Sequence, residues 1–168
     1  LQWWPEAQTV LLRFFDQHLK QVQTGQHQLQ LWDLGTQQWS SRPQPSALSW
    51  SLQGEGLACL DPASGRLNPN EAGVGQERIV HDPWRPVPAI GGHLSPSAGP
   101  ADRQSLDTRA DVATFTTAPL DGPLELAGQP QLLIRAGADQ PGFDLCLVLS
   151  RLPQGSAAVE QLSSGVLR

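Results

Sequence analysis

The sequence predicts a mainly β domain, an antiparallel sandwich or jelly roll, with one helix at its N-terminal end. Apolar residues recur at helical spacing only near the start of the chain, and after Gly25 they alternate with polar residues. Short strand-like runs are separated by turn residues, with 16 glycines and 15 prolines among 168 residues. Because no helices are predicted between these runs, the strands are expected to pair antiparallel.

The predicted helix begins near Pro5, whose missing N–H does no harm in a first helical turn, and closes at Gly25. Trp3 and Trp4 precede it. Its apolar stripe is wide, which favours a partner surface outside this chain. The stripe consists of Ala7, Val10, Leu11, Phe14, Phe15 and Leu19.

The strands are predicted from alternation of apolar and polar residues. The clearest is "FDLCLVLS", and the runs are 27–34, 47–53, 111–117, 124–128, 131–136 and 143–150. In addition, "GLACL" runs into the turn sequence "DPASG" and then Arg66-Leu67, which predicts a hairpin.

The stretch "HDPWRPVPAIGG", residues 81–92, opens an irregular segment that continues to Ala110. Its prolines fix an extended path, and Gly91-Gly92 allow a turn. We therefore predict an ordered strap across the sandwich rather than a disordered loop. Its expected apolar anchors are Trp84, Ile90, Leu94 and Leu106, and Asp107 and Arg109 are expected to pair or to bond backbone.

Composition limits the classes of function. The net charge is -5 with a single lysine, Lys20, which argues against nucleic acid and anionic membranes as partners. No apolar run reaches the length of a membrane span, which is about 18 residues or more. The sequence contains no GxSxG, HExxH, P-loop or GxGxxG motif, so it predicts no catalytic residue, no metal and no cofactor in this chain.

Several polar and aromatic features leave alternatives open. His81 and His93 have aspartates nearby, but without a nucleophile a structural role is expected. Stretches 139–144 and 99–102 fit turns better than a calcium site. Cys59 and Cys146 are expected to be buried free thiols, with a disulfide as the alternative, and the compartment stays open, the cytoplasm being slightly favoured. The six tryptophans suit core or interface packing, or a sugar-stacking platform.

Taken in order, five segments resemble the cocaine esterase and X-prolyl dipeptidyl peptidase group of serine hydrolases. They are "RFFDQHLK" followed by Gly25, "LWDLGTQQW", "HDPWRPVPAIGG", "GPADRQSLDTRADVATFTTAPLDGPLELAGQPQLLI" and "GFDLCLVLSRLPQGSAAVEQLSSGVLR". The resemblance covers nearly the whole chain. "PGFD" and "LPQG" depart from the acidic residue and the PDG turn of the family, which weakens any inference about domain contacts there.

The resemblance implies that residues 1–25 are the terminal helix of an α/β-hydrolase domain. Residues 26–168 would form most of a C-terminal jelly roll of the galactose-binding-like type. The family's Ser, Asp and His catalytic residues lie upstream, and its jelly roll continues beyond the "GVLR"-like strand. A truncated sheet would expose a strand edge and favour a homo-oligomer.

Two hypotheses follow, and whether the chain belongs to an enzyme stays open. In the first, the chain is a segment of a longer polypeptide: the non-catalytic domain of a hydrolase of esters or X-Pro peptides, which shapes the cleft beside the upstream α/β-hydrolase domain. In the second, it is a free-standing carbohydrate- or peptide-binding β-sandwich. The apolar helix favours the first, with an expected domain interface at Trp3, Trp4, Phe14, Phe15, His81 and Trp84.

Overall fold

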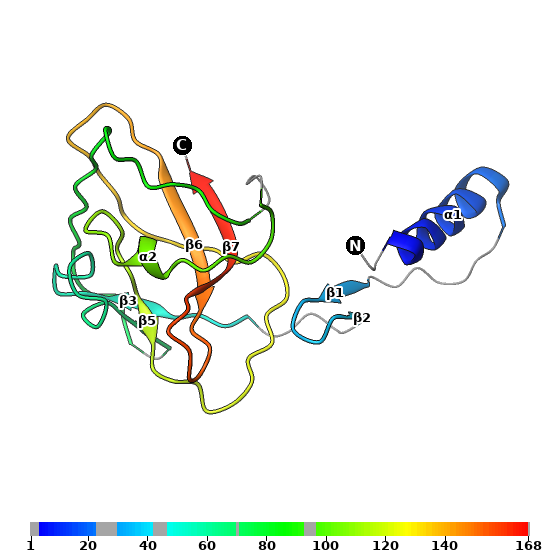
Figure 1. Cartoon of the computed structure of the whole chain (residues 1–168), viewed down its shortest axis with the longest axis horizontal. Helices are drawn as coiled ribbons and strands as arrows, with labels where there is room; N and C mark the ends of the chain where they lie inside the picture. Colours follow the sequence, from blue (N-terminus) through cyan, green and yellow to red (C-terminus); the bar gives the residue numbers. More distant parts are fainter. Residues whose placement is uncertain (1–3, 23–29, 42–46, 70, 93–96, 168) are drawn as a thin grey trace. The chain divides into compact units, whose positions relative to one another are not determined.

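The computed structural model describes residues 4–22, 30–41, 47–69, 71–92 and 97–167 (Figure 1). The chain divides into two units, Leu1–Gln44 and Pro45–Arg168. The first contains helix α1 and a small hairpin, and the second contains the remaining strands and one short helix.

Helix α1 runs from Trp4 to Lys20 and confirms the predicted N-terminal helix. Lys20 forms an ion pair with Asp16 one turn earlier, at 2.6 Å, and adds a cation to the last turn, where the helix dipole favours it. The helix ends earlier than predicted because Gln21 takes a left-handed φ of 55° and the Val22 N–H donates to the Asp16 carbonyl at 3.2 Å. Gly25 lies outside the described residues.

A tight hairpin follows in the first unit, formed by β1 (Leu31–Asp33) and β2 (Gln38–Ser40). The two strands pair antiparallel, with Trp32 opposite Trp39. The Asp33 carboxylate closes the turn by accepting hydrogen bonds from the N–H groups of Gly35, at 2.8 Å, and Thr36, at 3.2 Å. The strand predicted over 27–34 is confirmed in part, since residues 27–29 are not among those described.

The second unit holds a sheet of β3 (Ser51–Gln53), β4 (Arg66–Asn68) and β5 (Thr116–Thr117), in that order. β3 and β4 are antiparallel, whereas β4 and β5 are parallel, so the expectation of purely antiparallel pairing was wrong. The chain reaches β5 through the long segment 69–115, and such a crossover allows parallel pairing.

The hairpin predicted from "GLACL" through "DPASG" to Arg66-Leu67 is confirmed in part. Residues 62–64 form a turn and Arg66-Leu67 lie in β4, but β4 pairs with β3, because residues 58–60 form a turn and not a strand. The Glu77 carboxylate holds this turn by accepting hydrogen bonds from the N–H groups of Gly56 and Ala58, both at 3.0 Å. The Leu60 N–H donates to the Leu57 carbonyl at 2.8 Å. The Glu77 contacts join segments remote in sequence, and no local pattern reveals them.

The longest pairing joins β6 (Leu145–Arg151) to β7 (Glu160–Leu167) in an antiparallel ribbon with an irregularity between Leu149 and Ser150. It confirms the strand predicted from "FDLCLVLS". Arg151 and Glu160 pair across its far end as an ion pair.

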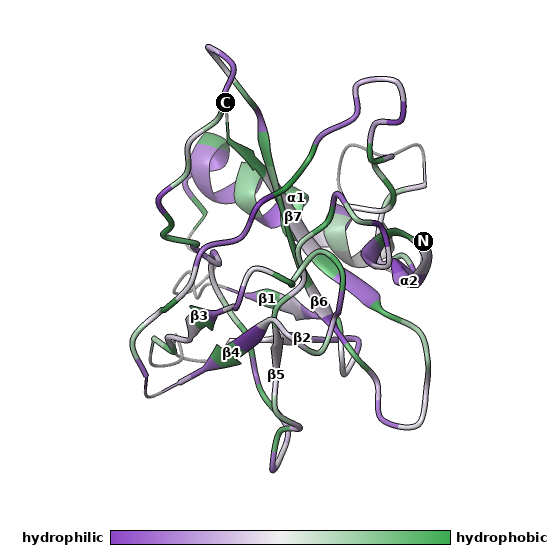
Figure 2. Ribbon diagram, turned by 90° about the vertical axis from the view of Figure 1, so that its left-hand side faces the viewer, coloured by the Kyte–Doolittle hydropathy of each residue, from purple (hydrophilic) through white to green (hydrophobic). Residues whose placement is uncertain are grey.

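Two predicted strands, 124–128 and 131–136, are not formed in the described chain. These residues are almost all exposed, and Leu133 is 95% exposed. Alternation of apolar and polar residues predicts a strand only where a neighbouring strand is present to pair with it. Hydrophobic residues accordingly lie in coil segments as well as in strands (Figure 2).

Helix α2 (Gln104–Asp107) interrupts the segment that was predicted to be irregular, and it carries Leu106, which is buried as expected of an anchor. Leu106 and Ala58 are the buried apolar residues among those described. The segment before α2 lies against β7: the Arg103 N–H donates to the Val159 carbonyl at 2.7 Å, and the Gln161 N–H donates to the Ala101 carbonyl at 2.8 Å.

The described residues therefore form a β-rich domain with few helices. Within them, no helix has both the length and the apolar character needed to cross a membrane.

Candidate domain-interface site

The strap, residues 81–92, contains a tight turn at its start. The Asp82 carboxylate accepts a hydrogen bond from the Trp84 N–H at 2.9 Å, and the Arg85 N–H donates to the Asp82 carbonyl at 3.0 Å. An aspartate at the first position of a turn, followed by proline, favours this geometry. We call residues 82–85 the Trp84 turn.

The far end of the strap turns at Gly91 and Gly92, with φ of 56° and 68°, as predicted. Gly92 and Gly99 exchange two backbone hydrogen bonds, of 2.9 and 3.0 Å. A Cβ at residue 91 would lie 2.5 Å from the Gly99 carbonyl oxygen, so only glycine fits there. The strap is thus fixed at both ends.

Arg109 clamps the strap from outside it. Its Nη2 donates to the Arg85 carbonyl at 2.6 Å, which confirms the expected bond to backbone. Its Nε and Nη2 also donate to the two carboxylate oxygens of Asp111, at 2.7 and 2.6 Å. The side chains of Arg109 and Asp111 are 24% and 11% exposed. Asp107, the other predicted partner, pairs instead with Arg103 at 3.1 Å.

The clamp keeps both of its charges. The hydrogen bond to Arg109 is the main cause that lowers the pKa of Asp111, and the nearby His81 lowers it further. The same hydrogen bond raises the pKa of Arg109. Since both groups stay ionised near neutral pH, this pair is suited to holding the backbone rather than to proton transfer.

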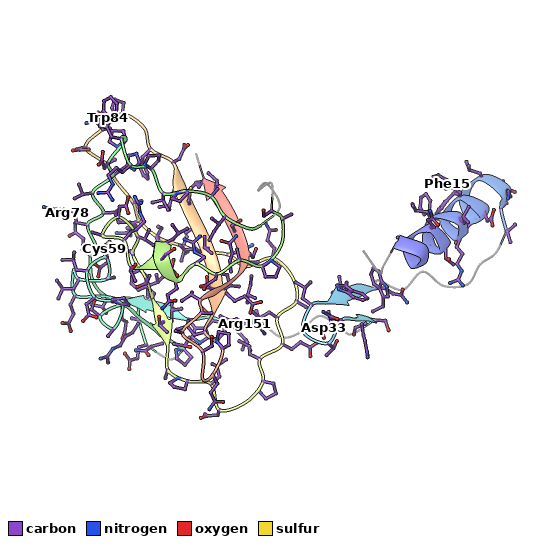
Figure 3. The ribbon with its side chains drawn as sticks, viewed as in Figure 1. Phe15, Asp33, Cys59, Arg78, Trp84 and Arg151 are labelled. Atoms are coloured by element: carbon purple, nitrogen blue, oxygen red, sulfur yellow. The ribbon has the colours of Figure 1, made fainter. Side chains whose placement is uncertain are left out.

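Trp84 was predicted to pin the strap to the sandwich, and this was wrong, because its side chain is 92% exposed. Figure 3 shows it at the edge of the second unit, pointing away from the strands. The Trp84 turn fixes the backbone so that the indole of Trp84 projects outward. His81 is exposed as well.

Helix α1 presents exposed aromatic side chains within its own unit, as predicted. Phe14 and Phe15 are 49% and 48% exposed, and their rings meet edge to face with centroids 5.6 Å apart. The Phe14 ring also lies 4.4 Å from that of His18. Trp3 and the side chain of Trp4 lie outside what the structure describes.

Two features of the structure were not predicted from the sequence. The rings of Trp32 and Trp39 pack across the β1–β2 hairpin with centroids 5.4 Å apart and planes at 70°. The turn signal of Asp33 and Gly35 between two tryptophans could have revealed this pair. The buried Arg103, whose Nη1 donates to Gln161 Oε1 at 3.1 Å, had no local signal.

The other candidate groups have structural contacts. Asp102, in a stretch considered for calcium, accepts hydrogen bonds from the N–H groups of Gln104 and Val159, both at 3.0 Å. These bonds lower the pKa of its carboxyl. Within the described segments, no group of three or more His, Cys, Asp or Glu residues is placed to hold a metal ion.

Both cysteines are free, so the disulfide alternative was wrong. Cys59 is half-buried, and this burial, with the charge of Glu77, raises the pKa of its thiol. Cys146 was expected to be buried but is exposed, because alternate residues of β6 face solvent in this unit.

Comparison with known proteins agrees with the family resemblance. The model of the X-Pro dipeptidyl-peptidase C-terminal non-catalytic domain matches residues 3–168. The chain is also similar to the cocaine esterase of Rhodococcus sp. (strain MB1 Bresler), with 29% identity over 177 residues. That match covers 97% of this chain but spans only 30% of the length of the relative. No solved structure matches the chain. Because the family model covers nearly all of it, the chain belongs to the family of X-Pro dipeptidyl-peptidase C-terminal non-catalytic domains.

Proposed function

We propose that this chain is the non-catalytic C-terminal part of a serine hydrolase that acts on esters or X-Pro peptides. An upstream α/β-hydrolase domain of the same polypeptide would supply the nucleophile. Residues 1–25 would be the last helix of that domain, and residues 26–168 would form most of a jelly-roll sandwich. The family match and the similarity to an esterase support this assignment.

The observation that carries the proposal is the exposed apolar surface of α1. Six apolar side chains of this one helix are about half exposed or more: Val10, Leu11, Leu12, Phe14, Phe15 and Leu19. A helix with so much apolar surface in water is stable only when another surface covers it. The terminal helix of a larger domain meets that requirement, whereas a free-standing module has no use for such a face.

The role of the domain would be to hold and shape the substrate cleft from outside the catalytic centre. Its contacts with the hydrolase domain would use the N-terminal aromatic residues and the strap, namely Trp3, Trp4, Phe14, Phe15, His81 and Trp84. The parts of the β6 and β7 edges that have no strand partner among the described residues would support a homo-oligomer.

The test uses the native protein in a lysate of its source. The lysate is treated with a fluorescent fluorophosphonate, which labels activated serines, and the protein is then captured with an antibody against residues 81–112. We expect a labelled band much larger than the 18.2 kDa of this chain. Pretreatment with unlabelled fluorophosphonate should abolish the label, which controls for non-specific staining.

An unlabelled band at the mass of this chain alone would refute the proposal. It would support the second candidate, a free-standing carbohydrate- or peptide-binding module. The exposed Trp32–Trp39 pair is the observation that favours it, since the indoles are 38% and 43% exposed. Their edge-to-face arrangement, with planes at 70°, makes them a poorer stacking platform than two coplanar rings would be.

A further inference from the structure

We propose that the Trp84 turn is a preorganised anchor that inserts the Trp84 indole into an acidic-edged apolar recess on the catalytic part of the same polypeptide. This inference rests on the proposed function. It adds a defined contact and its chemistry, and it identifies Arg109 and Asp111 as the residues that position the anchor.

The first argument is the exposure of the indole. Trp84 is 92% exposed, and it therefore contributes almost nothing to packing within its own unit. Tryptophan carries a large apolar area and one N–H donor, and it is among the residues that dominate binding energy when buried at the centre of an interface. Nearby in sequence, Ile79 and Val80 are also exposed, at 47% and 72%.

The second argument is the rigidity of the turn that carries it. Asp82 holds the Trp84 N–H, the Arg85 N–H closes the turn, and Arg109 holds the Arg85 carbonyl from a segment 24 residues away. Asp111 fixes Arg109 through two hydrogen bonds. A turn fixed in advance loses little conformational entropy on binding, so more of the contact energy appears as affinity.

The third argument is charge. The guanidinium groups of Arg78 and Arg85 form no ion pair within the described segments, whereas Arg109 is neutralised by Asp111. Figure 3 shows Arg78 at the periphery of the same unit, apart from Trp84. The side chain of Asp82 is already used as the turn acceptor. The turn therefore presents an apolar group next to the Arg85 guanidinium, which pairs with no carboxylate among the described residues, and this complements a recess with a carboxylate at its edge.

The identity of the occupant follows from the family. The matching model describes a non-catalytic domain, and the match covers only 30% of the length of the related esterase, so most of that relative lies outside it. A catalytic part of the same polypeptide is always present at high effective concentration, so it is the partner best placed to use a fixed anchor.

The experiment replaces Trp84 by the photo-crosslinking residue p-benzoyl-phenylalanine in the polypeptide expressed from its full gene. After irradiation, we expect crosslinked peptides that join position 84 to a segment outside residues 1–168, within a species of unchanged monomer mass. The same probe at Leu60, which is 72% exposed on a separate turn, is the matched control and should not give this crosslink. A crosslink to a second copy, seen at twice the mass, or no protein crosslink at position 84, would overturn the inference.

Two further variants test the clamp. Arg109→Lys keeps the charge but loses the paired hydrogen bonds, and we expect it to abolish most of the crosslink. Trp84→Ala should accelerate thermal inactivation of the full polypeptide about fivefold or more, as for a residue of hot-spot character, and Trp84→Phe should restore part of the loss. Unchanged crosslinking in Arg109→Lys would refute the positioning role.

Failure of this inference can be distinguished from failure of the proposed function. If the full polypeptide reacts with fluorophosphonate but position 84 crosslinks to nothing, only the anchor is wrong. If the natural protein is an unlabelled chain of only 18.2 kDa, the proposed function fails first.

Discussion

Arg103→Met tests how far buried polar contacts rather than a large apolar core hold the second unit together. The Arg103 side chain is 8% exposed and donates to Asp107 and to Gln161, each at 3.1 Å. Gln161, on β7, is 2% exposed. The substitution keeps an unbranched apolar stem but removes the guanidinium group, and with it both bonds.

The expected loss follows from these contacts. A hydrogen bond to a charged group contributes about 1.5–3 kcal/mol net, and a buried acceptor left without a donor costs about 1–3 kcal/mol. Asp107 is 20% exposed, so water replaces part of what it loses. We therefore expect a loss of about 3 kcal/mol in the free energy of unfolding, and a fall in Tm of about 6–12 °C for a chain of this size.

The assay is urea unfolding of the purified chain followed by tryptophan fluorescence. Arg151→Met is the matched control, because its ion pair with Glu160 is 58% exposed on the arginine side and should contribute less than about 1 kcal/mol. In a double-mutant cycle, Asp107→Asn and Arg103→Met should cost less together than the sum of their separate effects. Equal losses for the two arginine substitutions, or additive effects in the cycle, would refute this reasoning.

Three other predictions concern single sites. Gly65→Ala should lower the free energy of unfolding, measured by urea unfolding, by about 1–3 kcal/mol, because a Cβ at residue 65 would lie 1.9 Å from a backbone oxygen. Gly137→Ala is the control and should have no effect, because the space around residue 137 is open. Because the pKa of Asp111 is lowered in the folded chain, its stabilisation is present above the unfolded pKa, about 3.9, and is lost as pH falls through the folded value. Thermal unfolding between pH 7 and 2 should therefore show a weaker acid dependence in Asp111→Asn, and an unchanged profile would contradict this. Cys146, which is exposed, should react with thiol reagents faster than Cys59, because the raised pKa of Cys59 reduces its thiolate fraction. Peptide mass mapping measures the two rates, and faster labelling of Cys59 would contradict this prediction.

The candidate site was predictable in part. The exposure of Phe14 and Phe15 followed from a wide apolar stripe on a helix whose predicted partner surface lies outside this chain. The bend at the far end of the strap followed from Gly91-Gly92, whereas the turn at residues 82–85 interrupts the extended path that the prolines predicted. The direction of Trp84 did not, because the Arg109 clamp that helps fix its turn lies 24 residues beyond Arg85.

The sequence by itself determined the β-rich class, the N-terminal helix, the strand at β6 and the membership of the family, because these depend on local periodicity and on motifs in order. Only the tertiary structure decided the parallel pairing of β4 with β5, the turn at 58–60, the lack of strands at 124–136 and the partner of Asp107. Each of these depends on whether a segment remote in the sequence supplies the hydrogen-bond partner. A local pattern states what a segment favours, but pairing between distant segments determines what it forms.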